Sequence, residues 1–270
     1  MTRVLSFQNE QILYWRYIWQ KRKNSNLILT GFSIWKITCI STGKFSQKKG
    51  HKKEIRFLID ELGLEKPMSI LDVACGFGRH SIKLAEKGHY VTGIDRMDGF
   101  LCAAHKRAEF QGLKINFIQK DMREVVFNEE FDRALLLFTG FGYFSDDQNL
   151  EVLKNISKSL VPGGLFCFDT FNRDAFLKDF LPYHVREIRN DLMIDRNTFD
   201  PKTGRLIDKR IIIRDGKRKN VPFSIRLYDY NEIEKLIEQG GMKIDRIYGD
   251  WDKSHFTMDS KGMKIIAKKI

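Results

Sequence analysis

The chain has 270 residues, and its 47 Lys and Arg outnumber its 35 Asp and Glu to give a net charge of +12. Apolar residues make up 42% of the sequence, which is enough for a sizeable core in one large domain. The four cysteines lie far apart and form no C-x-x-C pair. This spacing argues against a zinc site and against a disulfide framework, and it fits a reducing cytoplasm.

The positive charge is concentrated at the amino end of the chain. Residues 1–53 hold eleven basic residues and one acidic residue, so the rest of the chain carries a net charge of only +2. A basic arm of this kind is able to contact RNA or an anionic surface, although a merely solvated segment has the same composition. The apolar run 27–40 is too short and too polar to span a membrane. We expect residues 1–44 to form a basic segment and residues 45–270 to form the main domain.

From about residue 45 onward the pattern becomes regular. Apolar residues at helical spacing predict a helix over residues 53–62. Strands are then expected at 69–74, 89–95, 115–120, 132–138 and 164–170, and helices at 78–87, 98–111 and 146–160. The continuous apolar run 135–138 is typical of a central strand that is buried on both faces. This alternation predicts an α/β fold with a doubly wound, mostly parallel, Rossmann-like sheet, in which ligands bind at the carboxyl ends of the strands.

The alternation changes after the fifth strand. Short strand-like runs at 192–198, 206–214 and 224–228 are separated by turns, which indicates an antiparallel insertion over residues 183–228. A helix is expected at 231–239, followed by two strands at 242–248 and 262–268 that would form a hairpin pair. These two strands bring the expected main sheet to seven.

The segment 69–81, SILDVACGFGRHS, carries the strongest indication of function. A short apolar strand runs into a turn with Gly76 and Gly78, a helix follows, and the next strand ends at Asp95. Glycines let the backbone approach a ligand closely, a helix N-terminus offers free N–H groups, and an acid at the next strand tip can hold ribose hydroxyls. The pattern therefore predicts a nucleotide-like ligand.

The details of this turn favour S-adenosylmethionine (SAM) over NAD. The dinucleotide fingerprint G-x-G-x-x-G requires a third glycine, and this position is Ser81. SAM has no pyrophosphate to place on the helix N-terminus, so it does not need that glycine. Cys75 is expected to act as a small apolar residue of the turn, since no base is evident beside it.

The block 71–78, LDVACGFG, resembles motif I of the class I SAM-dependent methyltransferases, and the resemblance extends over residues 45–270. It implies that Asp72 lies near the methionine end of SAM, that Asp95 holds the ribose, and that Asp121 and Met122 contact the adenine. The full set of cofactor-binding residues that it implies is Asp72, Ala74, Cys75, Gly76, Gly78, Asp95, Arg96, Asp121, Met122 and Phe138.

A narrower resemblance concerns the segment 138–144, FTGFGYF. It is similar to a string after the fourth strand of small-molecule methyltransferases, including amino-sugar N,N-dimethyltransferases, which also insert β-structure after the fifth strand. Tyr143 of this segment, which could hydrogen-bond the nucleophile, and Asn172, which follows the fifth strand at the reactive edge, are the candidate catalytic residues. Residues 1–43 depart from these relatives, which usually place an aromatic-bearing helix there that closes over SAM.

The function predicted from the sequence is SAM-dependent methyl transfer to nitrogen or oxygen of a small-molecule acceptor, in the cytoplasm and without a membrane partner. One alternative is an RNA methyltransferase that uses the basic residues 1–53, although no N-P-P-Y-type motif follows strand four. A second alternative is a non-catalytic SAM-binding protein of the same fold. The missing third glycine disfavours an NAD-dependent oxidoreductase. The sequence does not specify the acceptor or the oligomeric state.

Overall fold

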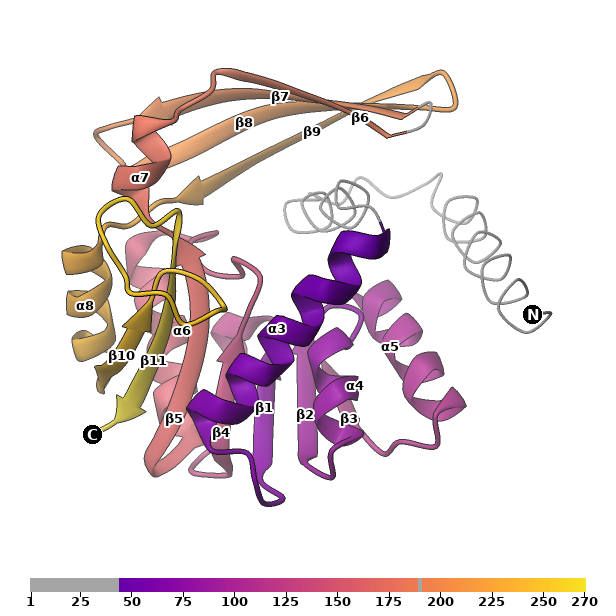
Figure 1. Cartoon of the computed structure of the whole chain (residues 1–270), viewed down its shortest axis with the longest axis vertical. Coiled ribbons are helices and arrows are strands. Elements are labelled where there is room, and N and C mark those ends of the chain that lie inside the picture. Colours follow the sequence, from indigo (N-terminus) through magenta and orange to yellow (C-terminus); the bar gives the residue numbers. More distant parts are fainter. Residues whose placement is uncertain (1–43, 189–190) are drawn as a thin grey trace.

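The computed structural model describes residues 44–188 and 191–270, and a seven-stranded sheet lies at its centre (Figure 1). Its strand order is β10-β11-β5-β4-β1-β2-β3. Strands β1 to β5 are parallel, whereas β11 runs antiparallel to both β5 and β10. The strands are β1 (Ser69–Val73), β2 (Tyr90–Asp95), β3 (Asn116–Gln119), β4 (Phe131–Leu136), β5 (Leu160–Phe171), β10 (Met242–Tyr248) and β11 (Gly262–Lys269).

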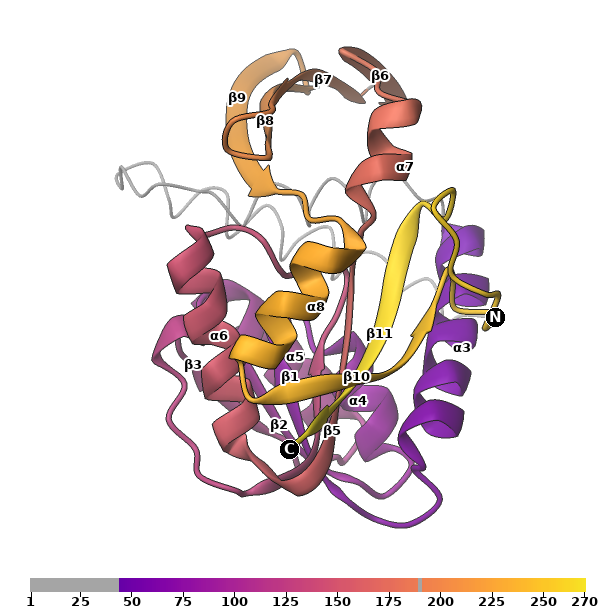
Figure 2. The same ribbon diagram turned by 90° about the vertical axis from the view of Figure 1, so that its left-hand side faces the viewer.

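Helices cover both faces of this sheet, as the view along its edge shows (Figure 2). Helices α6 (Asp146–Ser159) and α8 (Tyr230–Gln239) lie on one face, and α3 (Lys44–Leu62) and α4 (Arg79–Ala85) lie on the other. Helix α5 (Asp98–Phe110) packs beside α4. None of the helices in the described residues is long and apolar enough to cross a membrane. The predicted doubly wound α/β fold is confirmed.

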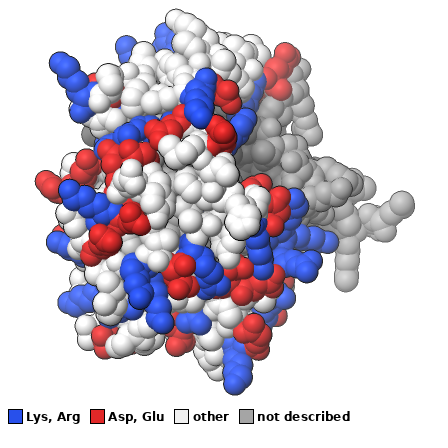
Figure 3. Space-filling view, turned by 60° about the vertical axis from the view of Figure 1, so that its left-hand side comes forward, with Lys and Arg blue, Asp and Glu red and all other residues white. Residues whose placement is uncertain are grey.

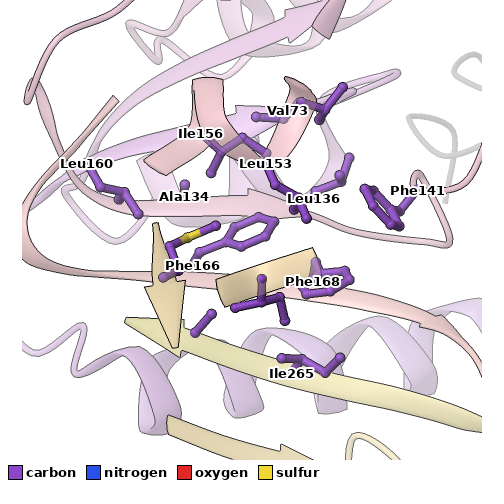
Figure 4. Close-up of a cluster of buried hydrophobic side chains, with 14 of the residues drawn as sticks. Val73, Ala134, Leu136, Phe141, Leu153, Ile156, Leu160, Phe166, Phe168 and Ile265 are labelled. Atoms are coloured by element: carbon purple, nitrogen blue, oxygen red, sulfur yellow. The ribbon is translucent and has the colours of Figure 1, made fainter. Parts of the chain in front are cut away.

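Strand β4 contributes apolar side chains to the cores on both faces of the sheet. Ala134 and Leu136 point into the core under α6 and α8, while Leu135 points into the core under α3 and α4. All three side chains are fully buried, because successive residues of a strand face opposite sides of a sheet. Figure 4 shows the first of these cores, where Phe166 and Phe168 stack with ring centroids 5.0 Å apart. Each large apolar side chain buried here contributes about 1.5–3 kcal/mol to stability.

A second sheet lies over the carboxyl ends of the parallel strands (Figure 1). Helix α7 (Arg173–Lys178) leads into it from β5. The sheet is antiparallel throughout and has the order β6-β7-β8-β9. Its strands are β6 (Tyr183–Ile188), β7 (Asp191–Asp200), β8 (Arg205–Arg214) and β9 (Lys217–Arg226). The expected antiparallel β-structure after the fifth strand is thus present.

Two parts of the second sheet differ from the strands expected from sequence. Strand β6 was not expected, and β9 begins at Lys217 and ends at Arg226, where the sequence suggested a short strand at 224–228. Lys217, Arg218 and Lys219 are exposed and Pro222 interrupts the pattern, so the first half of β9 does not look like a strand. An edge strand tolerates these residues, because one side of its backbone faces solvent.

Candidate functional site

The turn after β1 brings the backbone close to the carboxyl edge of the sheet. Ala74, Gly76 and Gly78 have φ angles of 54°, 57° and 67°, in the left-handed region that favours glycine. A Cβ on Gly78 would lie 2.9 Å from the ring of Phe117, so a larger residue does not fit there. The Cys75 N–H donates to the Ile94 carbonyl at 2.9 Å and fixes the turn against β2.

Asp95 at the end of β2 holds this turn. Its carboxylate accepts the N–H of Gly76 at 2.9 Å and the N–H of Met97 at 2.8 Å. Burial raises the pKa of Asp95, while the two backbone N–H groups oppose that rise. A carboxylate has about four lone-pair positions, so two remain for the hydroxyls of a ligand. The side chain of the next residue, Arg96, is exposed.

Asp72 is a second buried carboxylate beside the turn. It is only 2% exposed, and its Oδ2 accepts the hydroxyl of Ser81 at 2.5 Å. Burial raises its pKa to about 6, and its charge also contributes to raising the pKa of Asp95. Ser81, the residue in place of the third fingerprint glycine, therefore binds an acid instead of permitting close packing. Two buried carboxylates would repel a pyrophosphate and attract a cation, which fits the sulfonium and ammonium groups of SAM.

Asp121 and Met122 follow the end of β3. Met122 begins the short 3₁₀ helix Met122–Glu124, and Asp121 is its N-cap. Arg123 binds both oxygens of Asp121, at 3.0 and 2.9 Å, and these hydrogen bonds lower the pKa of that acid. The Arg123 guanidinium also lies 4.3 Å from the ring centroid of Phe144. The side chain of Met122 packs against the main core. Asp121 is thus already paired within the chain, although a carboxylate can accept further hydrogen bonds.

The segment after β4 has an unusual backbone at Phe138 and Thr139. Both residues have positive φ angles, 67° and 54°, a conformation that costs about 1–3 kcal/mol for a residue other than glycine. Asp169 near the end of β5 accepts both N–H groups, that of Thr139 at 3.3 Å. The Arg79 guanidinium lies 4.9 Å from the centroid of the Phe138 ring. Strain held in this way is frequent where a backbone is shaped for a ligand.

The sequence reasoning did not select Asp169, although a signal was present. Asp169 is an acid at the carboxyl end of a parallel strand, the same position that singled out Asp95. It is buried, which raises its pKa, and it lies in register with Lys264 of β11. Its two hydrogen bonds make it the residue that fixes the path of Phe138.

Tyr143 connects this edge to the second sheet. Its ring packs against the buried side chains of Leu206, Ile225 and Leu227, and the neighbouring Gly142 carbonyl accepts the N–H of Arg226 at 2.8 Å. Burial raises the pKa of Tyr143 above the ordinary value for tyrosine. Its hydroxyl therefore stays protonated near neutral pH and serves as a hydrogen-bond donor or acceptor, not as a base.

Asn172 occupies a structural position just after β5. Its Oδ1 accepts the N–H of Asp174 at the start of α7, and its Nδ2 donates to the carbonyls of Met258 and Ser260 at 3.1 and 3.0 Å. The side chain is 1% exposed. Both N–H groups of the amide are used in these bonds, so Asn172 connects the end of β5 to the loop before β11.

Comparisons with known proteins agree with this geometry. Residues 70–164 match the family model described as a methyltransferase domain. The chain is similar to the Bacillus subtilis protein named "Putative methyltransferase YqeM", with 26% identity over 77% of this chain and 87% of that protein. It is also similar to a SAM-dependent methyltransferase structure from Clostridium acetobutylicum, with a TM-score of 0.76 and 21% identity over 87% of this chain and 98% of that one. CalS10 of Micromonospora echinaspora, an amino pentose methyltransferase solved with SAM, has a TM-score of 0.63 and 17% identity over 92% and 100% of the two chains.

These findings establish the enzyme class. Residues 70–164 are a methyltransferase domain, and the predicted methyltransferase activity is confirmed at that level. The SAM prediction agrees with the matched methyltransferase domain, with the fold shared with solved SAM-dependent methyltransferases and with the acid-lined turn.

Proposed function

We propose that this SAM-dependent methyltransferase transfers a methyl group to a nitrogen or oxygen atom of a small molecule. The observation that carries the proposal is the second sheet over the carboxyl edge of the main sheet, joined to the segment 138–144. Arg205 of β8 strengthens this junction by donating to the Phe144 carbonyl at 2.8 Å. A sheet in this position would enclose a compact acceptor. The amino pentose methyltransferase CalS10 has a similar fold.

The cofactor-binding roles follow from the carboxyl edge. Asp95 would accept the ribose hydroxyls with its two remaining lone-pair positions, and Asp72 would lie near the methionine end. Asp121 and Met122 would contact the adenine. Arg96 and the strained backbone at Phe138 would make further contacts with the cofactor. The turn after β1 would contribute Ala74, Cys75, Gly76 and Gly78. The Cys75 thiol would contribute only packing, because burial raises its pKa well above the ordinary value.

The chain contributes to the reaction mainly by positioning. Bound SAM supplies an electrophilic methyl group on a good leaving group, so the protein must align the acceptor lone pair with that carbon. Alignment of this kind can lower a barrier by about 7–11 kcal/mol. Tyr143 would hydrogen-bond the acceptor atom, and Asn172 would act indirectly by holding the end of β5. A nucleophile that starts protonated must lose its proton during the reaction, to solvent or to a nearby acceptor.

The RNA alternative rests on residues 1–53, most of which lie outside the described residues. On the face that Figure 3 shows, basic and acidic side chains are mixed and form no continuous basic stripe. Binding of nucleic acid usually needs such a stripe, since phosphate contacts dominate its affinity. This face therefore favours the small-molecule proposal.

Calorimetric titration of the full chain with S-adenosylhomocysteine and with NADH tests the cofactor half of the proposal. We expect the homocysteine compound to bind and NADH not to bind. Asp95→Ala should lose this binding, because it removes the ribose acceptor and the anchor of the Gly76 N–H. Asp98→Ala, which removes an exposed acid of α5, is the matched control.

The acceptor half needs a turnover measurement. The full chain is incubated with SAM and pools of small amines or small alcohols and phenols, and formation of S-adenosylhomocysteine is followed. We expect turnover with at least one pool, and a Tyr143→Phe variant should retain cofactor binding while losing turnover. A parallel incubation contains RNA in place of the small molecules. Turnover only with RNA, or cofactor binding with no turnover in any incubation, would contradict the proposal in favour of one of the two alternatives.

A further inference from the structure

His51, Glu54 and His80 form a compact cluster outside the cofactor turn. His51 and Glu54 lie one helical turn apart on α3, and His80 is the second residue of α4. One ligand atom from each residue lies within 4.8 Å of the other two. The two imidazole rings meet edge to face, with centroids 5.2 Å apart. Imidazole and carboxylate groups bind transition metals most readily where no thiolate is present. Tertiary packing places two imidazoles and one carboxylate together here.

His51 has a polar atom that the fold leaves unused. Its Nε2 is buried and has no hydrogen-bond partner among the described residues. An unpaired buried polar nitrogen costs about 1–3 kcal/mol, so a fold normally supplies a partner for it. Burial lowers the pKa of both His51 and His80 to about 4, which leaves the two rings neutral at pH 7. Neutral imidazole is the form that binds a metal.

The charges around Glu54 set the conditions for a bound cation. Arg79 and His80 both contact the same oxygen of Glu54, Oε2, at 2.5 and 2.9 Å. Among the described residues no hydrogen bond reaches the other oxygen, Oε1, which leaves it available as a ligand. Arg79 would then keep Oε2 as an outer contact, an arrangement usual for carboxylates that bind metals. The positive charges of Arg79 and Lys83, which also oppose protonation of His51, would weaken the affinity for a cation.

We propose that His51, Glu54 and His80 bind a divalent transition-metal ion, with Zn²⁺ as the best-fitting ion, and that this ion fastens α3 to α4. Two histidines and one carboxylate are a ligand set that zinc uses with a fourth position open to water. Zinc–ligand bonds of about 2.0–2.1 Å bring tetrahedral ligand atoms to about 3.3 Å from one another. The cluster must therefore contract from its present 4.8 Å, which rotation of the half-buried His51 ring on α3 can supply. The expectation of no metal rested on cysteine spacing, and this site uses no cysteine.

The test is zinc binding by the full, untagged chain, measured by equilibrium dialysis and by calorimetry with ZnCl₂. We expect one Zn²⁺ per chain for the unmodified protein. His51→Ala should weaken binding at least 10-fold, since even outer contacts of metal sites change affinity about 10–100-fold. His105→Ala, which removes an exposed histidine of α5, should bind zinc like the unmodified protein.

A second readout identifies the ligands without relying on affinity alone. Co²⁺ bound at four or five positions has strong visible absorption, which we expect for the unmodified chain and not for His51→Ala or Glu54→Gln. Circular dichroism of each variant establishes that it is folded. Equal zinc affinity of His51→Ala and the unmodified chain would overturn the proposal, as would no binding by the unmodified chain at 100-fold molar excess of zinc.

Discussion

Asp72→Asn should make the protein more stable at neutral pH while weakening its hold on the cofactor. Asp72 is buried, and its pKa is raised from 3.8 to about 6. A folded-state pKa above the unfolded value means that the native state binds more protons between pH 4 and 6, so stability falls as the pH rises through that range. A shift of about two units corresponds to about 3 kcal/mol of stability lost above pH 6. Asparagine has the same shape and no charge, so it avoids this loss.

The assay is urea unfolding of the unmodified protein and of Asp72→Asn at pH 5 and pH 7.5. The variant should be more stable by about 3 kcal/mol at pH 7.5, and its advantage should shrink by about 1.5 kcal/mol at pH 5, where Asp72 of the folded unmodified protein is mostly protonated. Glu151→Gln removes an exposed acid of α6 and should show neither effect. The reasoning would be refuted if Asp72→Asn were less stable than the unmodified protein at pH 7.5. It would also be refuted if the gain in the free energy of unfolding were the same at both pH values.

Three further predictions concern stability. Gly78→Ala should destabilise the protein by about 1–3 kcal/mol in urea unfolding, because its φ is positive and its new methyl group meets Phe117. Tyr228→Phe should cost about 1–3 kcal/mol in the same assay, because the buried amide of Asn149 loses its hydrogen bond to the hydroxyl and the exposed Asp146 loses another. Arg210→Met should cost about 3–5 kcal/mol at pH 8 and less at pH 5, because it leaves two buried carboxylates of the second sheet unpaired until they are protonated; a cost independent of pH would contradict this.

Local patterns in the sequence were sufficient to predict the turn after β1 and the acid that holds it. The strand, the glycine turn and Asp95 are close in sequence, and their geometry follows from backbone rules that act over a few residues. The buried strand β4 was also recognisable, because burial on both faces leaves a continuous apolar run. Sequence alone therefore predicts the main sheet and the turn.

The rest depends on contacts between distant segments. Asn172 was predicted as catalytic from its place after β5, but its amide bonds to a loop 86 to 88 residues away, which no local pattern reveals. The pairing of Glu54 with Arg79 and His80 joins two helices whose separate sequences give no hint of it. The first half of strand β9 was not predicted, because it is basic and exposed. In each case the missing information is tertiary packing.

The two ends of the second sheet meet where they leave the domain. The Arg173 N–H donates to the Tyr228 carbonyl at 3.1 Å, and the Arg173 side chain bonds to Asp229 and to Glu232 at the start of α8. An inserted segment whose first and last residues lie in contact can change in length or sequence with little effect on the domain that carries it. Evolution, or a protein engineer, can therefore replace residues 174–227 as a unit while the carboxyl edge that we propose as the SAM site stays the same. The acceptor preference of such enzymes can diverge faster than their use of the cofactor.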